Sequence, residues 1–372
     1  MSDRIIPDSD SESLRISGLD EFQTHLRELE NDPSMPFNLK LFDDVELQLT
    51  ESNIPPLLPT ALPPLTHILR TTTQDPSPLL SLTIKLLSPL TFTRTLTIAD
   101  PPSILTALTS PLPGANLLAL AIIHKAAKTP TEAALLSTLP DVVEALISRW
   151  LETPDVGVGE RAAKVLGDLL ETDCETIRGE GVNGVGSQGN INGTEVVRRR
   201  IPGHGRLWRL ILLQRPILEL IKTLCSPETA DPPTRPRRQT SLSQGRLLRL
   251  LTRLATLNIR AISQTAFPDL FPLPAAAIQT AGQGILQWAA LSMVSKSEDI
   301  LMHLNLIDFF ETFVSVMRVS RLTSEENAIV RNLVRAAAQE DDQLKEALRG
   351  LPNRTVEEEA EPLRSYINDI LN

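Results

Sequence analysis

The sequence predicts an all-α fold, arranged as a right-handed α-solenoid of HEAT-like or armadillo-like helical repeats. Three observations support this prediction. Aromatic residues make up only 3% of a chain that is 41% hydrophobic, so Leu, Ala and Ile must form the core, which suits helix-on-helix packing. The 29 prolines can start helices and occupy the turns between them. Amphipathic segments follow one another along the chain, and each needs stacked neighbours to cover its apolar stripe.

Residues 155–172 give the clearest example of a repeat helix. Their apolar side chains share one stripe of helical period, formed by Val158, Ala162, Val165, Leu166, Leu169 and Leu170. Ala163 and Gly167 leave a shallow strip beside it, where a neighbouring helix can approach closely. This pattern predicts the second helix of a repeat.

The N-terminal part of the chain reads as a polar tail followed by paired helices. Residues 1–17 are rich in Ser and Asp and are expected to be disordered. N-terminal repeats are expected over residues 18–178, with helices over 19–30, 37–49, 57–70, 77–87, 101–109, 116–128, 140–150 and 155–172. Ser17 is expected to cap the first of them.

The spacing of these helices favours HEAT-like or armadillo-like repeats. The midpoints Ile84, Ala121 and Ala162 lie 37 and 41 residues apart. Repeats of these classes have a period of about 40–47 residues, so the chain should hold roughly seven or eight helix pairs.

The C-terminal part should contain further repeats over residues 195–372, interrupted by two loops. Residues 179–194 are rich in Gly and Asn and should form a flexible loop, and residues 227–239, rich in Pro and Arg, should be extended or disordered. Pro216 is expected to start the second helix of a pair within 203–226. Further helices are expected over 240–258, 274–294, 296–319 (two short helices or one bent one), from a capping box at Thr323, and over 356–371.

Charge is unevenly distributed. The chain carries a net charge of −10, but residues 196–260 hold 14 Arg or Lys against 3 acidic residues, a net of +11. A basic middle in an acidic protein indicates a partner with an acidic surface. The alternative, left open at this point, is that the arginines solvate exposed helix faces.

Known catalytic and cofactor motifs are not supported. The pattern G-x-G-x-x-G occurs twice between Gly179 and Gly189, but a helix precedes it where a dinucleotide site needs a strand. The five histidines lack metal-ligand spacing, and no G-x-S-x-G occurs. We therefore expect no enzyme, cofactor or metal site. Residues 237–240, Arg-Arg-Gln-Thr, resemble the target of an arginine-directed kinase at the start of a helix, with Thr240 as the acceptor.

Features bearing on location are few. Cys174 and Cys225 form no C-x-x-C motif, so a reducing compartment is expected. The N-terminus lacks a signal-peptide core, and we expect no apolar run near the ~20 residues of a membrane span. These features favour a monomer in the cytoplasm, or in the cytoplasm and nucleus, with no membrane contact.

The segment 203–226 resembles the central region of the fungal proteasome base-assembly chaperones. The resemblance rests on Gly205, Leu207-Trp208-Arg209, Ile217, Leu220-Ile221 and Leu224-Cys225-Ser226. This family is related to the animal proteasome non-ATPase regulatory subunit five, and in fungi it carries a label linking it to DNA mismatch repair. The resemblance implies a curved stack of HEAT-like repeats that binds the C-terminal domain of one ATPase subunit of the regulatory-particle base during assembly. Leu210-Ile211-Leu212 stands where a further basic residue would be expected.

Five residues are therefore candidates for partner contact. Trp208 and Arg209 lie in the segment that carries the resemblance, while Arg246, Arg249 and Arg253 are chosen because they should form one outer stripe of charge. Two other functions remain open, a solenoid adaptor in transport or signalling and a nucleic-acid repair factor that uses the basic middle. Nucleic acid is the less favoured partner, since the basic region has one Trp and no Tyr or Phe for base stacking.

Overall fold

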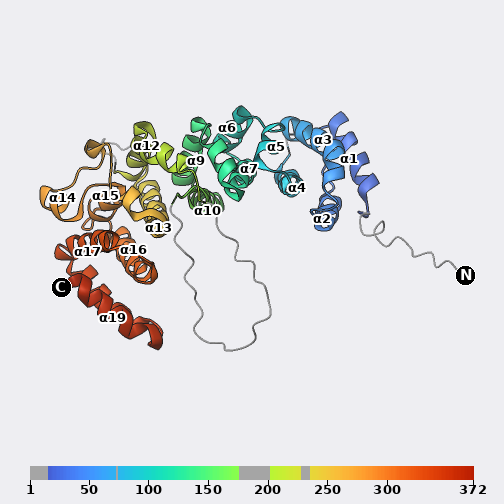
Figure 1. The fold of residues 1–372 in the computed structure, drawn as a ribbon. Helices are drawn as coiled ribbons and strands as arrows, with labels where there is room; N and C mark the ends of the chain where they lie inside the picture. Colours follow the sequence, from blue (N-terminus) through green and yellow to red (C-terminus); the bar gives the residue numbers. More distant parts are fainter. Residues whose placement is uncertain (1–15, 73, 176–201, 228–234) are drawn as a thin grey trace, which may run out of the picture. The chain divides into compact units, whose positions relative to one another are not determined.

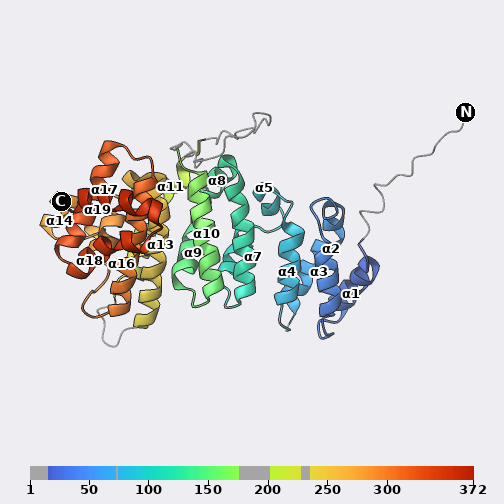
Figure 2. The same ribbon diagram turned by 90° about the horizontal axis from the view of Figure 1, so that it is seen from below.

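The computed structural model describes residues 16–72, 74–175, 202–227 and 235–372. In these residues the secondary structure is helical, with no β-strand, and one isolated bridge pairs Gln264 with Gln283 (Figures 1 and 2). The all-α prediction is confirmed. The contacts divide the chain into two compact units, Met1–Lys125 and Ala126–Asn372, called unit 1 and unit 2.

Unit 1 consists of short helices that pack both against the next helix in the chain and against the helix after that. Helix α1 contacts α3, α2 contacts α4, and α7 packs against both α4 and α6. Its helices are α1 (Leu19–Asn31), α2 (Leu39–Gln48), α3 (Leu58–Thr71), α4 (Ser77–Leu87), α5 (Phe92–Leu96), α6 (Pro101–Thr109) and α7 (Pro113–His124). Proline occupies the first turn of α3, α4, α6 and α7, where its missing N–H is not needed.

A buried lysine links two elements of unit 1. The Lys125 side chain follows α7 and is 7% exposed. Its Nζ donates hydrogen bonds to three carbonyl oxygens at the C-terminal end of α4, those of Leu87 (2.7 Å), Ser88 (3.2 Å) and Leu90 (3.0 Å). The three carbonyls lie at or just beyond the end of α4, where the negative end of the helix dipole favours a cation.

Unit 2 is organised around a long central helix, α13. Helix α13 (Arg237–Ile262) contacts α9, α10, α12, α15, α16 and α17, and most of its circumference is buried. The other helices of the unit are α8 (Pro130–Leu136), α9 (Pro140–Glu152), α10 (Val156–Thr172), α11 (Arg206–Leu212), α12 (Arg215–Cys225), α14 (Ala275–Ala281), α15 (Ile285–Leu291), α16 (Ile300–Val319), α17 (Ser324–Gln339), α18 (Asp342–Gly350) and α19 (Glu357–Leu371).

Several local predictions agree with the structure. The stripe predicted for residues 155–172 is buried along α10, and Asp155 caps this helix by accepting a hydrogen bond from the Val158 N–H (2.8 Å). Pro216 lies in the first turn of α12. Thr323 and Glu326 form the predicted capping box of α17. In each case the signal is local, so the sequence contains all of it.

Other elements differ from the predictions. The helix expected over 274–294 is two helices, because Gly282 adopts a left-handed φ of +83° and a Cβ on Gly284 would lie 2.4 Å from the Ser263 carbonyl carbon. The cap of α1 is Gly18, also left-handed, rather than Ser17. Residues 300–319 form one helix. The short helices α5, α8 and α18 were not predicted, since they hold only a turn or two of apolar pattern.

The two units meet in the sequence at Lys125. The sequence pattern predicted the boundary between N-terminal and C-terminal repeats later in the chain, at residues 178–195. The loop predicted at 179–194 and most of the tail at 1–17 lie outside the described residues, as does part of the loop predicted at 227–239. The last residues of that second segment, from Arg237 onward, begin α13.

Candidate functional site: two hollows beside the central helix

The three candidate arginines of α13 face α10 and the end of α9. Arg246 is 3% exposed, so the prediction that it lies on an outer stripe is wrong. Its Nη1 donates hydrogen bonds to the carbonyl oxygens of Trp150 (2.9 Å) and Thr153 (2.7 Å) at the C-terminal end of α9. The physical reason is that these carbonyls have no partners within α9, and a guanidinium can satisfy several of them at once.

Arg249 and Arg253 are held by carboxylates of α10. Arg253 Nη2 lies 2.7 Å from Asp168 Oδ1 and 2.7 Å from Glu171 Oε2, and Arg249 Nη1 lies 2.9 Å from Glu160 Oε1. Burial alone would lower the pKa of Arg253, but the two carboxylates outweigh burial and raise that pKa. Arg249 stays the most accessible of the three, with 63% of its side chain exposed.

Small residues on α10 make room for these arginines. A Cβ on Gly159 would lie 2.2 Å from Arg246 Nη2, and a Cβ on Gly167 would lie 2.1 Å from Arg253 Nη1. The shallow strip predicted around Gly167 therefore exists, and the guanidinium groups of α13 occupy it. The positive charge of the basic middle is, at these positions, largely matched inside unit 2.

A groove runs between α13 and α16. It has a volume of about 340 Å³ and is lined by Leu248, Arg249, Thr252, Arg253 and Thr256 of α13 and by Asp308, Phe309, Thr312 and Val316 of α16. Two of the five candidate residues, Arg249 and Arg253, thus border a real depression. Its walls combine apolar carbons and threonine hydroxyls with two arginines on the α13 side and one aspartate on the α16 side, which suits contact with another protein's side chains.

The outer face of α16 extends this groove. We give this name to the residues of α16 that share one exposed stripe, Leu301, Leu304, Asp308, Thr312 and Val319. Leu301 is 75% exposed, Leu304 54% and Val319 65%. Helix α16 is apolar around most of its circumference, and such helices are normally covered on all sides. Unit 2 leaves this stripe of α16 exposed, together with Ile300 and Asn305.

Helix α16 also has the length and mean hydropathy, 1.4, of a helix that can cross a membrane. The expectation that no apolar run reaches that length was therefore wrong. Core helices of globular domains share these properties, and α16 packs against α13, α17, α18 and α19.

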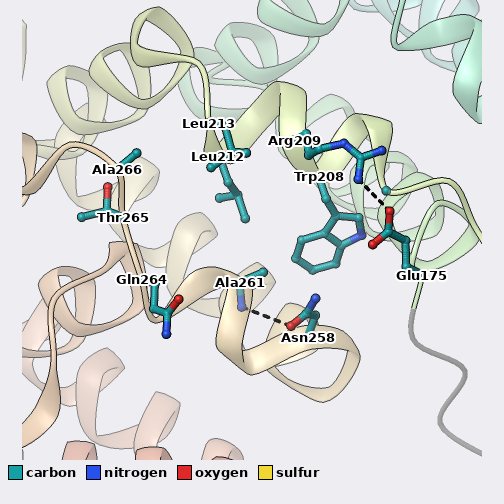
Figure 3. A pocket seen from close by; sticks show the side chains of 11 residues that line it. Glu175, Trp208, Arg209, Leu212, Leu213, Asn258, Ala261, Gln264, Thr265 and Ala266 are labelled. Atoms are coloured by element: carbon teal, nitrogen blue, oxygen red, sulfur yellow. Dashed lines mark hydrogen bonds and ion pairs between the residues drawn. The ribbon is translucent and has the colours of Figure 1, made fainter.

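A second hollow lies where α11 faces the end of α13 (Figure 3). It has a volume of about 390 Å³ and is lined by Glu175, Gly205, Trp208, Arg209, Leu212, Leu213, Asn258, Ala261, Gln264, Thr265 and Ala266. Asn258 interrupts the helical backbone of α13, with φ −157° and ψ 81°, and its Oδ1 accepts a hydrogen bond from the Ala261 N–H (3.1 Å). The interruption sets back one wall of the hollow.

Trp208 and Arg209 belong to this second hollow. Trp208 is 6% exposed, and its Nε1 donates a hydrogen bond to the Leu170 carbonyl (2.8 Å), so only part of its ring reaches the space. Arg209 is about half exposed, and its Nη1 lies 2.6 Å from Glu175 Oε1. Figure 3 shows this pair at the rim of the hollow. The structure therefore brings four of the five candidates to two separate places, Arg249 and Arg253 to the groove and Trp208 and Arg209 to the second hollow, and it brings Arg246 to neither.

Asp173 positions the α11 wall, and the sequence analysis missed it. Its Oδ2 accepts hydrogen bonds from the N–H groups of Leu207 (2.7 Å) and Trp208 (3.3 Å) at the start of α11. Burial raises the pKa of this carboxyl despite those bonds. Gly205 supports the turn before α11 with a left-handed φ of +61°. Asp173 follows α10 directly, so its position as a cap for a later helix has no local signal.

Within the described residues no group of His, Cys, Asp and Glu side chains is arranged to hold a metal ion. The chain matches no protein-family model, and a search of curated proteins finds no match.

Proposed function

We propose that this chain is a non-enzymatic assembly chaperone that binds the C-terminal domain of an ATPase subunit of the proteasome regulatory-particle base. It would act as a monomer, in the cytoplasm or in the cytoplasm and nucleus. The proposal includes the finer architecture: the helix pairs stack as a right-handed α-solenoid of HEAT-like or armadillo-like repeats.

The observation that carries the proposal is the outer face of α16 together with the α13–α16 groove. Leu301, Leu304 and Val319 expose apolar carbon on one stripe, and the groove beside it offers Arg249 and Asp308 as polar contacts. An apolar stripe with charged groups at its edge is the usual composition of a protein–protein contact. The resemblance of residues 203–226 to the base-assembly chaperones supports the identity of the partner.

The arrangement of the arginines favours a protein partner over nucleic acid. Binding to a phosphate backbone would need free cations along a track. Arg246 is committed to backbone carbonyls and Arg253 to two carboxylates, so this stripe supplies few free cations.

The mechanism would be occlusion. A chaperone that covers part of an ATPase subunit prevents premature contacts there and stabilises the bound form by mass action. The outer face of α16 is a helix surface with a fixed backbone, so binding should need little reordering of this chain.

Titration calorimetry with the purified C-terminal domain of each base ATPase subunit tests the proposal. The double variant Leu301→Asp/Leu304→Asp should weaken binding by more than about tenfold, or ~1.4 kcal/mol, because it places two charges in an apolar contact. Leu301 lies in the first turn of α16, which suits an acidic residue, and Leu304 is 54% exposed, so the variant should stay folded. Leu47→Asp is the matched control, since Leu47 is 84% exposed on α2 of unit 1.

The outcomes separate two parts of the proposal. If none of the ATPase domains binds the unmodified chain, the proposed partner is wrong. If one binds and the double variant binds equally well, the partner stands and the outer face of α16 is not the contact.

A further inference from the structure

The start of α13 carries a sequence that the proposed binding surface does not use, Arg237-Arg238-Gln239-Thr240-Ser241. The sequence pattern favours Thr240 as a kinase acceptor. The structure argues against that residue, because Thr240 is 6% exposed and its Oγ1 accepts a hydrogen bond from Arg235 Nη2 (3.3 Å). Ser241 is the next residue and is partly exposed.

The Ser241 hydroxyl ties α13 to α16. Its Oγ donates to Asp299 Oδ2 at 2.7 Å, with a weaker contact to the Arg237 carbonyl at 3.2 Å. Asp299 is the N-cap of α16, and its other oxygen, Oδ1, accepts a hydrogen bond from the Met302 N–H (3.0 Å). One carboxylate therefore holds both the first turn of α16 and the first turns of α13.

Two arginines on the same helix could pair with a phosphate on Ser241. Arg237 and Arg238 are exposed, and neither has a side-chain partner among the described residues. They precede Ser241 by four and three residues, so all three side chains lie on one side of the helix. A phosphoserine at this position would have two guanidinium groups within reach and a carboxylate, Asp299, on its other side.

We propose that Ser241 is a phosphorylation site for an arginine-directed serine/threonine kinase, and that its phosphate releases the tether between α13 and α16. The kinase would recognise Arg238 three residues before the acceptor. Ser241 lies near the start of α13, where N–H groups lack partners within the helix and local opening is easiest.

The transfer uses a nucleoside triphosphate as co-reactant. Ser241 Oγ forms a bond to the γ-phosphorus, the bond from that phosphorus to its bridging oxygen breaks, and the nucleoside diphosphate leaves. The hydroxyl proton passes to the base of the kinase. The product carries a charge of about −1.5 to −2 near neutral pH and can no longer donate a hydrogen bond to Asp299.

Release follows from charge. The phosphate and the Asp299 carboxylate repel each other at contact distance, whereas Arg237 and Arg238 attract the phosphate. Asp299 then moves away and its bond to the Met302 N–H weakens. The first turn of α16 includes Leu301, which belongs to the outer face of α16, so the modification would also change the proposed binding surface. That last step alone rests on the proposed function.

Treatment of the full chain with the catalytic subunit of cyclic-AMP-dependent kinase and MgATP, followed by phosphopeptide mapping, tests the site. The expected result is one phosphate at Ser241, lost in Ser241→Ala and retained in the matched control Thr240→Val. Phosphate on Thr240, or a chain that accepts none, would overturn the assignment.

Hydrogen exchange tests the release. Amides of residues 300–303 should exchange about fivefold faster in the phosphorylated chain, the effect expected for the loss of a helix cap. Amides within α17 should not change. Unchanged exchange at residues 300–303 in a fully phosphorylated sample would overturn the release. This readout needs no partner, so it stands or falls separately from ATPase binding.

Discussion

Replacing Arg246 with Met provides the sharpest test of how unit 2 is held together. Met keeps most of the apolar stem and removes every donor, so the change isolates the bonds to α9. The wild-type guanidinium makes two short hydrogen bonds, to the carbonyls of Trp150 and Thr153, and weaker ones to Leu151 (3.3 Å) and Asp155 (3.4 Å).

The expected effect follows from those bonds. A hydrogen bond that involves a charged group contributes roughly 1.5–3 kcal/mol to stability, so the loss of two short ones should destabilise unit 2 by about 3–6 kcal/mol. The carbonyls cannot all find water, because Arg246 and Thr153 are both almost fully buried. For a unit of this size the melting temperature should fall by about 6 °C or more.

Urea unfolding followed by far-ultraviolet circular dichroism measures the effect. Arg249→Met is the matched control, three residues away on the same helix and facing the same neighbour. Its ion pair with Glu160 is exposed on both sides, so its loss should change stability by less than about 1 kcal/mol. Equal losses of unfolding free energy in the two variants would refute the view that the hydrogen bonds of buried Arg246 to α9 stabilise unit 2.

Two further predictions concern the same unit. Gly159→Ala should destabilise it by roughly 1–3 kcal/mol, because the new Cβ meets the almost fully buried guanidinium of Arg246. Gly167→Ala meets Arg253, whose side chain is 34% exposed and has more room to shift, so it should cost less. Matching urea midpoints for the two variants would contradict this. The second concerns pH. Burial alone would raise the pKa of Asp341, but the Leu344 N–H, His303 and Lys296 outweigh burial and lower that pKa. The ionised carboxylate therefore stabilises the folded state above the ordinary Asp pKa of about 4. This stabilisation is lost as the pH falls through the lower pKa of the folded state. Stability curves of wild type and Asp341→Asn should therefore converge in acid, and parallel curves would show that this carboxyl does not contribute.

The sequence predicted those features of the fold whose causes lie close together in the chain. The stripe of α10, the proline that starts α12 and the capping box of α17 each depend on residues within one or two turns. The break between α14 and α15 has one local cause, the left-handed Gly282, and one distant cause that the sequence pattern does not mark. Gly284 must be small because Ser263, some twenty residues earlier in the chain, passes against it.

The candidate site could be predicted only in part for a similar reason. A cation beside an apolar stripe can extend into solvent or reach the end of another helix, and both arrangements have the same local pattern. Arg246 reaches the end of another helix. Its partners are backbone carbonyls more than ninety residues earlier in the chain, and no side-chain motif marks them. The outer face of α16 had a usable signal, since leucines continue around the helix where polar residues should begin.

Lys125 and Arg246 show that a buried cation at a helix C-terminus is a repeated device in this chain. Each reaches back to an earlier helix, α4 in unit 1 and α9 in unit 2, and each donates to carbonyls at or just beyond the end of that helix. The two residues lie in different units and are different cations, so a common physical need explains them better than a common sequence. The net charge of the basic middle is therefore larger than the positive charge that a partner could contact. Of the three arginines on the α13 stripe, Arg249 alone keeps most of its side chain in solvent. For the proposed partner of unit 2, we therefore expect contact mainly with the apolar carbon of α16, and we expect Arg249 and Asp308 to set its orientation.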